Sequence, residues 1–71
     1  MASVQELRER IRRVDQMVDK SLRDHWKGLK QKAVDNAEVE LKAAEEAAKK
    51  GEPLRAIHHR IRAEILLFPF Q

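Results

Sequence analysis

The chain has no cysteine, only two glycines and two prolines, and three aromatic side chains, Trp26, Phe68 and Phe70. Without cysteine it forms neither disulfides nor thiolate metal sites, which fits a reducing compartment. Long apolar runs are missing as well. The longest one, residues 65–70, is far shorter than the ~20 residues that span a bilayer, and residues 1–6 have no apolar signal core. We therefore expect a cytoplasmic protein without a membrane span.

A chain of 71 residues is one domain, residues 1–71, and its core is small. A domain near this length buries only ~60% of the surface that its unfolded chain exposes. Small domains often add disulfides, a metal or oligomerisation to reach stability. Since disulfides are excluded, we expect self-association to contribute to the stability of this chain.

Strand patterns are absent, so the sequence predicts an all-α protein. There is no alternating apolar run and no hairpin dipeptide. Ser3 and Glu6 fit a capping box, and an apolar stripe at helical spacing then continues from Val4 to Ala48. We predict one long helix over residues 3–50, bent at Gly28, because a single internal glycine costs only ~1 kcal/mol relative to alanine. The alternative is a compact three-helix bundle that breaks at Gly28.

The end of this helix is marked more clearly. Lys49 suits the negative end of the helix dipole, Gly51 suits a left-handed C-terminal cap, and Pro53 suits the first position of a new helix. This predicts a turn at residues 51–53 and a second, antiparallel helix at 53–68, which together make a helical hairpin. The tail, residues 69–71, is expected to fold onto the hairpin. The alternative is that Phe68-Pro69-Phe70-Gln71 docks into a pocket of a partner.

The second helix is apolar on two sides. We predict that its large side chains pack against small ones of the first helix, because large and small residues interdigitate closely. The large set is Leu54, Ile57, Ile61, Ile65 and Phe68, and the small set is Ala33, Ala37, Ala44, Ala47 and Ala48. The opposite side carries Ala56, Ala63 and Leu67 with Leu66 nearby, and a helix apolar on two sides is usually sandwiched between neighbours.

In this arrangement the second helix is too short to cover the first half of the long stripe. Leaving these large side chains in water would cost on the order of 10 kcal/mol, so we expect them to bind a partner. The predicted partner-binding residues are Val4, Leu7, Ile11, Val14, Val18, Leu22, His25, Trp26 and Leu29. The expected assembly is coiled-coil-like, a homodimer or higher helical oligomer that forms a helical bundle. The expected function is a small adaptor, assembly factor or accessory regulatory subunit that also binds another protein.

The alternative function is a dimeric helical regulator that binds nucleic acid through the basic N-terminal half. Residues 1–32 hold nine Lys or Arg against five Asp or Glu. The candidate phosphate contacts are Arg8, Arg12, Arg13, Lys20, Arg23, Lys27 and Lys30. Acidic residues interrupt this basic stretch, and the few aromatics leave little for base stacking, so protein binding is favoured.

No pattern of catalytic or metal-binding residues is present. His58 and His59 are adjacent, so they point ~100° apart on a helix and do not chelate one ion together. Glu38, Glu45 and Glu46 are explained by ordinary ion pairs along a helix. We therefore expect a protein that is not an enzyme and that holds no cofactor or metal.

Residues 40–69 loosely resemble a tetratricopeptide helical pair. The similarity rests on small, turn and stop positions at Ala44, Gly51, Ala56, Ile57, Ala63 and Pro69. Arg60 and Glu64 stand where the pattern has apolar residues, and one repeat does not form a solenoid. We interpret the resemblance as convergent hairpin chemistry, without membership of the family.

Overall fold

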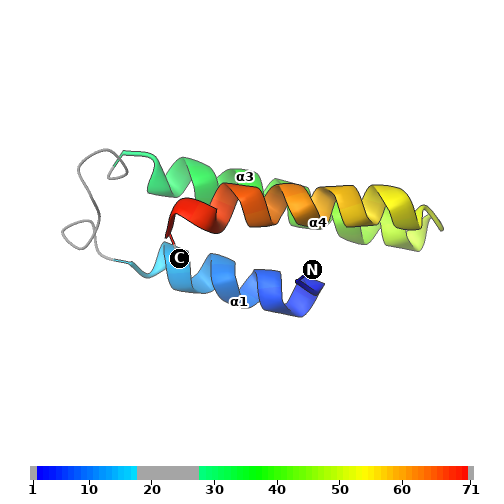
Figure 1. Cartoon of the computed structure of the whole chain (residues 1–71), viewed down its shortest axis with the longest axis horizontal. Coiled ribbons are helices and arrows are strands. Elements are labelled where there is room, and N and C mark those ends of the chain that lie inside the picture. The colour runs from blue at the N-terminus through cyan, green and yellow to red at the C-terminus, as the bar shows by residue number, and fades with distance from the viewer. Residues whose placement is uncertain (1, 18–27, 71) are drawn as a thin grey trace.

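The structure is a computed structural model that describes residues 2–17 and 28–70. These residues form three α-helices and a short 3-10 helix: α1 (Val4–Asp15), α3 (Lys30–Lys49), α4 (Pro53–Leu67) and η2 (Phe68–Phe70). No strand occurs among the described residues, so the all-helical prediction is confirmed for them. Figure 1 shows α3 and α4 side by side, with the shorter α1 packed along the pair.

Helix α1 begins where the capping pattern indicates. The Ser3 Oγ accepts a hydrogen bond from the backbone N–H of Glu6 at 3.1 Å, which satisfies one of the free amides of the first turn. At its other end the N–H of Gln16 donates to Arg12 and the N–H of Met17 donates to Val14, both at 3.1 Å. The helix therefore ends at Asp15, and the predicted helix over 3–50 is wrong.

A lysine closes the end of α1. The Lys30 Nζ, at the start of α3, donates to the carbonyl oxygens of Asp15 and Met17, both at 2.9 Å. Lysine often satisfies the free carbonyls at a helix C-terminus, where the helix dipole also favours positive charge. This contact ties the end of α1 to the beginning of α3, and α1 packs back on α3 and α4.

Gly28 lies in a turn, and α3 begins two residues later at Lys30. The compact three-helix alternative is thus closer to the structure than the long helix. It too needs a correction, because α1 has already ended at Asp15, well before Gly28. The apolar spacing continues past Asp15 in the sequence, but the α-helical hydrogen bonds do not, because the N–H of Met17 bonds to Val14, three residues earlier, instead of to the residue four earlier.

The reversal between α3 and α4 is built on Gly51. Its φ of 73° lies in the left-handed region, which glycine adopts without steric cost. The N–H of Glu52 donates to Ala47 at 2.9 Å and that of Gly51 donates to Ala48 at 3.2 Å. These two bonds form a Schellman motif that satisfies the last carbonyls of α3, and Pro53 then starts α4.

Gly51→Ala is expected to lower the free energy of unfolding by about 1–2 kcal/mol, because only the backbone conformation opposes the new methyl group. No atom lies within 4 Å of the added Cβ at either glycine. Gly28→Ala is the matched control, and we expect no loss, or a gain of up to ~1 kcal/mol from the unfolded chain. Thermal unfolding followed by circular dichroism compares the two. Equal losses would contradict the left-handed turn.

The core lies where the three helices meet. It takes Leu7, Ile11 and Val14 from α1, Val34, Ala37 and Leu41 from α3, Ala63 and Leu67 from α4, Phe70 from η2, and Ala2. Leu7, Leu67 and Val34 are its largest fully buried side chains. Phe70 is buried, so this part of the tail folds onto the helices. This agrees with the prediction that the tail packs on the chain itself.

The buried face of α4 is not the predicted one but the face opposite to it. Ala56, Ala63 and Leu67 are buried, whereas Leu54, Ile65 and Phe68 are exposed. The physical reason is that α4 contacts α1 as well as α3, and small residues at the contact let helices approach closely. Ala37 and Ala63, both fully buried, fill this position between the helices.

Candidate interaction surface

The structure gives most of the predicted partner-binding residues a role within the chain itself. Leu7, Ile11 and Val14 are buried in the core, and Val4 is half-buried against it. Leu29 is 39% exposed, and Val18, Leu22, His25 and Trp26 lie outside the described residues. The prediction that this half of the stripe lacks an internal partner is therefore wrong for Leu7, Ile11 and Val14, because α1 packs on α3 and α4.

Three of the candidate phosphate contacts within the described residues, Arg8, Arg12 and Lys30, have partners within the chain. Arg8 pairs with Glu45 across the α1–α3 contact, and Arg12 lies 3.7 Å from Glu9. Lys30 closes the end of α1. Arg13 forms no ion pair with any residue that the structure describes, whereas Lys20, Arg23 and Lys27 lie outside these residues. The nucleic-acid alternative stays a prediction.

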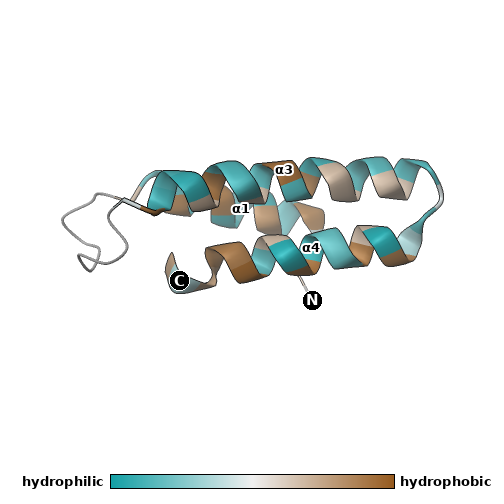
Figure 2. Cartoon of the chain, turned by 90° about the horizontal axis from the view of Figure 1, so that it is seen from above, coloured by the Kyte–Doolittle hydropathy of each residue, from teal (hydrophilic) through white to brown (hydrophobic). Residues whose placement is uncertain are grey.

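Large apolar side chains line the outside of α4 and the first residue of η2. These are the residues predicted to face inward, Leu54, Ile57, Ile61, Ile65 and Phe68, and we call this set the outer stripe. Four of them, all except Ile57, are 40% to 75% exposed. Figure 2 shows that apolar segments recur along α4 and become dense toward its C-terminal end. Soluble monomers rarely expose large contiguous apolar patches without an interaction to explain them.

The outer stripe has a basic border on the side of α3. Arg55, His58 and Arg62 follow one another along this border, and we call them the basic rim. The Nε of Arg62 lies 3.2 Å from a Glu40 carboxylate oxygen of α3, and Arg55 lies 3.8 Å from Glu52. Both arginine side chains are more than two thirds exposed, so each keeps donors directed to solvent.

Glu40 of α3 contacts two residues of α4 near this border. Its two carboxylate oxygens are divided between Arg62 and His59, whose Nδ1 lies 2.7 Å away. The Glu40 side chain is only 15% exposed. These contacts join α4 to α3 on the side of the basic rim.

The opposite border of the outer stripe faces α1. Glu64 accepts a hydrogen bond from the N–H of Ala2 at 2.7 Å and lies 3.7 Å from Arg10. Arg60 also belongs to this side, and its Nε is buried without a partner among the described residues. The carboxylate of Glu64 is therefore committed to α1, and this border offers no free acidic group.

An apolar hollow continues the outer stripe toward the turn. Helix α1 is shorter than α3, so the turn end of the α3–α4 pair extends beyond it (Figure 1). The hollow has a volume of about 360 Å³ and is lined by Val4, Ala44, Ala48, Gly51, Pro53, Ala56, Ile57 and Arg60. Ile57 belongs to both the hollow and the outer stripe, so the two form one surface.

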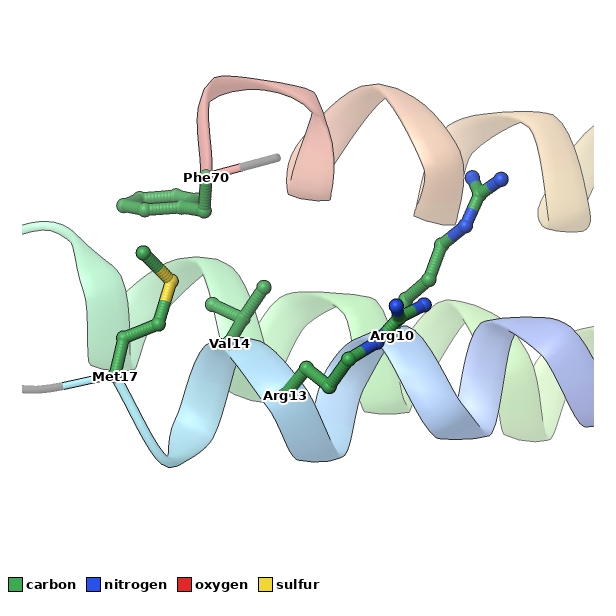
Figure 3. Close-up of a pocket in the computed structure, with 5 residues that line it drawn as sticks. All are labelled: Arg10, Arg13, Val14, Met17 and Phe70. Atoms are coloured by element: carbon green, nitrogen blue, oxygen red, sulfur yellow. The ribbon is translucent and has the colours of Figure 1, made fainter.

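A second cavity, of about 420 Å³, lies between α1 and the C-terminal end (Figure 3). The ring of Phe70 lies over Met17 and Val14 on one side of the cavity, and the guanidinium groups of Arg10 and Arg13 lie on its other side. Arg10 is shared with Glu64, which leaves one exposed guanidinium. A single exposed ion pair contributes only ~0–1 kcal/mol, so the charge at this cavity does not indicate an anion site.

Within residues 2–17 and 28–70, no three His, Asp or Glu side chains are grouped closely enough to hold a metal ion. In the same part of the chain, no helix has the length and apolar character needed to cross a membrane. The expectation that the chain is not an enzyme stays a prediction.

Comparisons with known proteins add no relatives. No family model matches the chain, and neither a curated protein nor a solved structure shows significant similarity to it. The function must therefore be argued from the surface of the molecule.

Proposed function

We propose that this protein is a non-enzymatic protein–protein interaction module, a small adaptor, assembly factor or accessory subunit, which binds its partner through the outer stripe of α4. One observation carries the proposal: Leu54, Ile61, Ile65 and Phe68 are 40% to 75% exposed along a single face of a helix. The stripe of the N-terminal half was predicted to bind the partner. It is not proposed for that role, because most of its described large residues are buried within the chain.

The energetics support a role for this surface. Covering the exposed parts of these four side chains would contribute about 4–8 kcal/mol, at about 1.5–3 kcal/mol for each fully buried large apolar residue. Leaving these apolar side chains in water adds nothing to the free energy of unfolding of a marginally stable domain. A partner recovers this free energy on binding, although association itself carries an entropic cost of similar size.

Site-specific photo-crosslinking in the native host tests the proposal. With a benzophenone amino acid at Ile61 or Ile65, we expect adducts of one discrete mass, because these positions would lie inside the interface. Glu38 and Lys42 on α3, which are exposed and lie away from the stripe, are the matched control positions and should give none. Adding Phe68→Glu should abolish the adducts from Ile61. Adducts that form equally at all four positions, or at none, would contradict the proposal.

A further inference from the structure

The charge around the outer stripe indicates what kind of partner it takes. Arg55 and Arg62 are seven residues apart, so two turns of helix bring both to the same side of α4, about 10 Å from each other. Between them lies His58, which completes the basic rim. Helix α4 holds three arginines against one glutamate, and that glutamate, Glu64, is committed to Ala2 and Arg10. The surface is thus apolar along its centre and bordered on one side by exposed guanidinium groups, each of which pairs within the chain with a single carboxylate, Glu52 or Glu40.

A second copy of the chain fits this charge poorly. In an antiparallel two-fold pair each border of the stripe faces its own copy, so one basic rim would oppose the other. In a parallel pair the basic rim would face the side of Arg60 and Glu64, where the carboxylate is already occupied by the N–H of Ala2 at 2.7 Å. Neither arrangement supplies Arg55 or Arg62 with an acidic group beyond those already paired within the chain, which are Glu40, Glu52 and Glu64.

We propose that the occupant of the outer stripe is an acidic amphipathic helix of another protein, and this inference rests on the function proposed above. The stripe from Leu54 to Phe68 is about 21 Å long, at 1.5 Å per residue, and accommodates four turns of a partner helix. The partner's apolar residues, spaced by three and four, lie on the stripe. Its Asp or Glu residues lie on the side of the basic rim and pair with Arg55 and Arg62.

The rim charges select the partner more than they strengthen its binding. Complementary charges at the edge of an interface raise the association rate and disfavour wrong partners, and their effect falls with salt. The apolar centre supplies the affinity, and its contribution changes little with ionic strength. The two contributions can therefore be separated by experiment.

Three fluorescein-labelled helical peptides provide the probe. They share one pattern of leucines and carry Glu, Gln or Lys along one flank, and their binding to the intact protein is measured by fluorescence anisotropy at low salt. We expect the Glu peptide to bind roughly tenfold more tightly than the Gln peptide, from two rim ion pairs, and the Lys peptide to bind most weakly. This preference should shrink as salt is raised.

The double variant Arg55→Glu/Arg62→Glu should reverse the order of the three peptides. The matched control is Arg12→Glu/Lys42→Glu, which makes the same change of charge at exposed positions away from α4 and should preserve the order. Far-ultraviolet circular dichroism verifies that each variant keeps its helices. Reversal in the first variant alone supports the acidic partner.

Other outcomes would overturn the inference in distinguishable ways. Equal binding of all three peptides would remove the acidic specificity but leave the outer stripe as a binding surface. Equal binding by Ile61→Glu/Ile65→Glu would remove the surface as well. A dimer in sedimentation equilibrium that Ile65→Glu dissolves would make the occupant a second copy. Binding to phosphatidylglycerol vesicles, with no preference among the peptides, would make it a membrane surface.

Discussion

Leu7→Ala is expected to lower the free energy of unfolding by about 2–5 kcal/mol, the usual cost of removing a buried leucine side chain. Leu7 has no exposed surface and lies in the core cluster between α1 and the other two helices. A domain of this length has a total stability of about 4–10 kcal/mol, so the variant should be partly unfolded at moderate temperature. Urea titration followed by the helical circular dichroism signal measures the loss.

Leu54→Ala is the matched control, because it removes the same atoms from a side chain that is 75% exposed. Surface substitutions of this kind usually change stability by less than ~0.5 kcal/mol. The sequence-predicted hairpin reverses this ranking, since there Leu54 packs inward and Leu7 faces a partner. A larger loss in Leu54→Ala than in Leu7→Ala would therefore support that hairpin and contradict the arrangement of the three helices.

Local rules in the sequence located the ends of several helices. Ser3 marks the first turn of α1 because its hydroxyl satisfies a nearby amide, and Gly51 marks the reversal because it alone tolerates the positive φ. Each of these features depends on residues within one or two turns. Such features are visible in a single sequence, because no distant part of the chain decides them.

The end of α1 at Asp15 had no comparable signal. The apolar spacing continues from Val14 to Val18 without a glycine or proline, so the pattern favours a continuous helix. The contact that closes this end comes from Lys30, on another helix. A lysine at that position is compatible with many surface roles, and only the packing of α1 against α3 shows which one it has.

The prediction that the large side chains of the second helix pack inward is the second one that the structure contradicts. The spacing groups five large residues of this helix into one stripe, but periodicity identifies the faces of a helix without saying which one turns inward. Two contacts accompany the observed orientation of α4: Arg62 lies beside Glu40 of α3, and Glu64 accepts a hydrogen bond from the N–H of Ala2. Both connect residues distant in the sequence, so the candidate interaction surface could be recognised only once the three helices were in place.

Ala63→Leu tests that orientation directly. Ala63 is fully buried between the helices, and added methyl groups in a packed core cost about 1–3 kcal/mol through displaced neighbours. We expect a loss in that range, measured by urea titration. We also expect Ile61 and Ile65 to keep their exposure to solvent, because the strain should be taken up between α4 and α3.

Ala48→Leu is its counterpart at a site with free space. Ala48 is exposed on α3 and lines the hollow near the turn, so the added side chain should be accommodated, with a gain of up to ~1 kcal/mol from partial burial. If α4 instead turned its large stripe inward, Ala63 would lie at the surface and the first substitution would be harmless. A neutral Ala63→Leu would thus place the outer stripe inside the molecule and remove the basis for partner binding through α4.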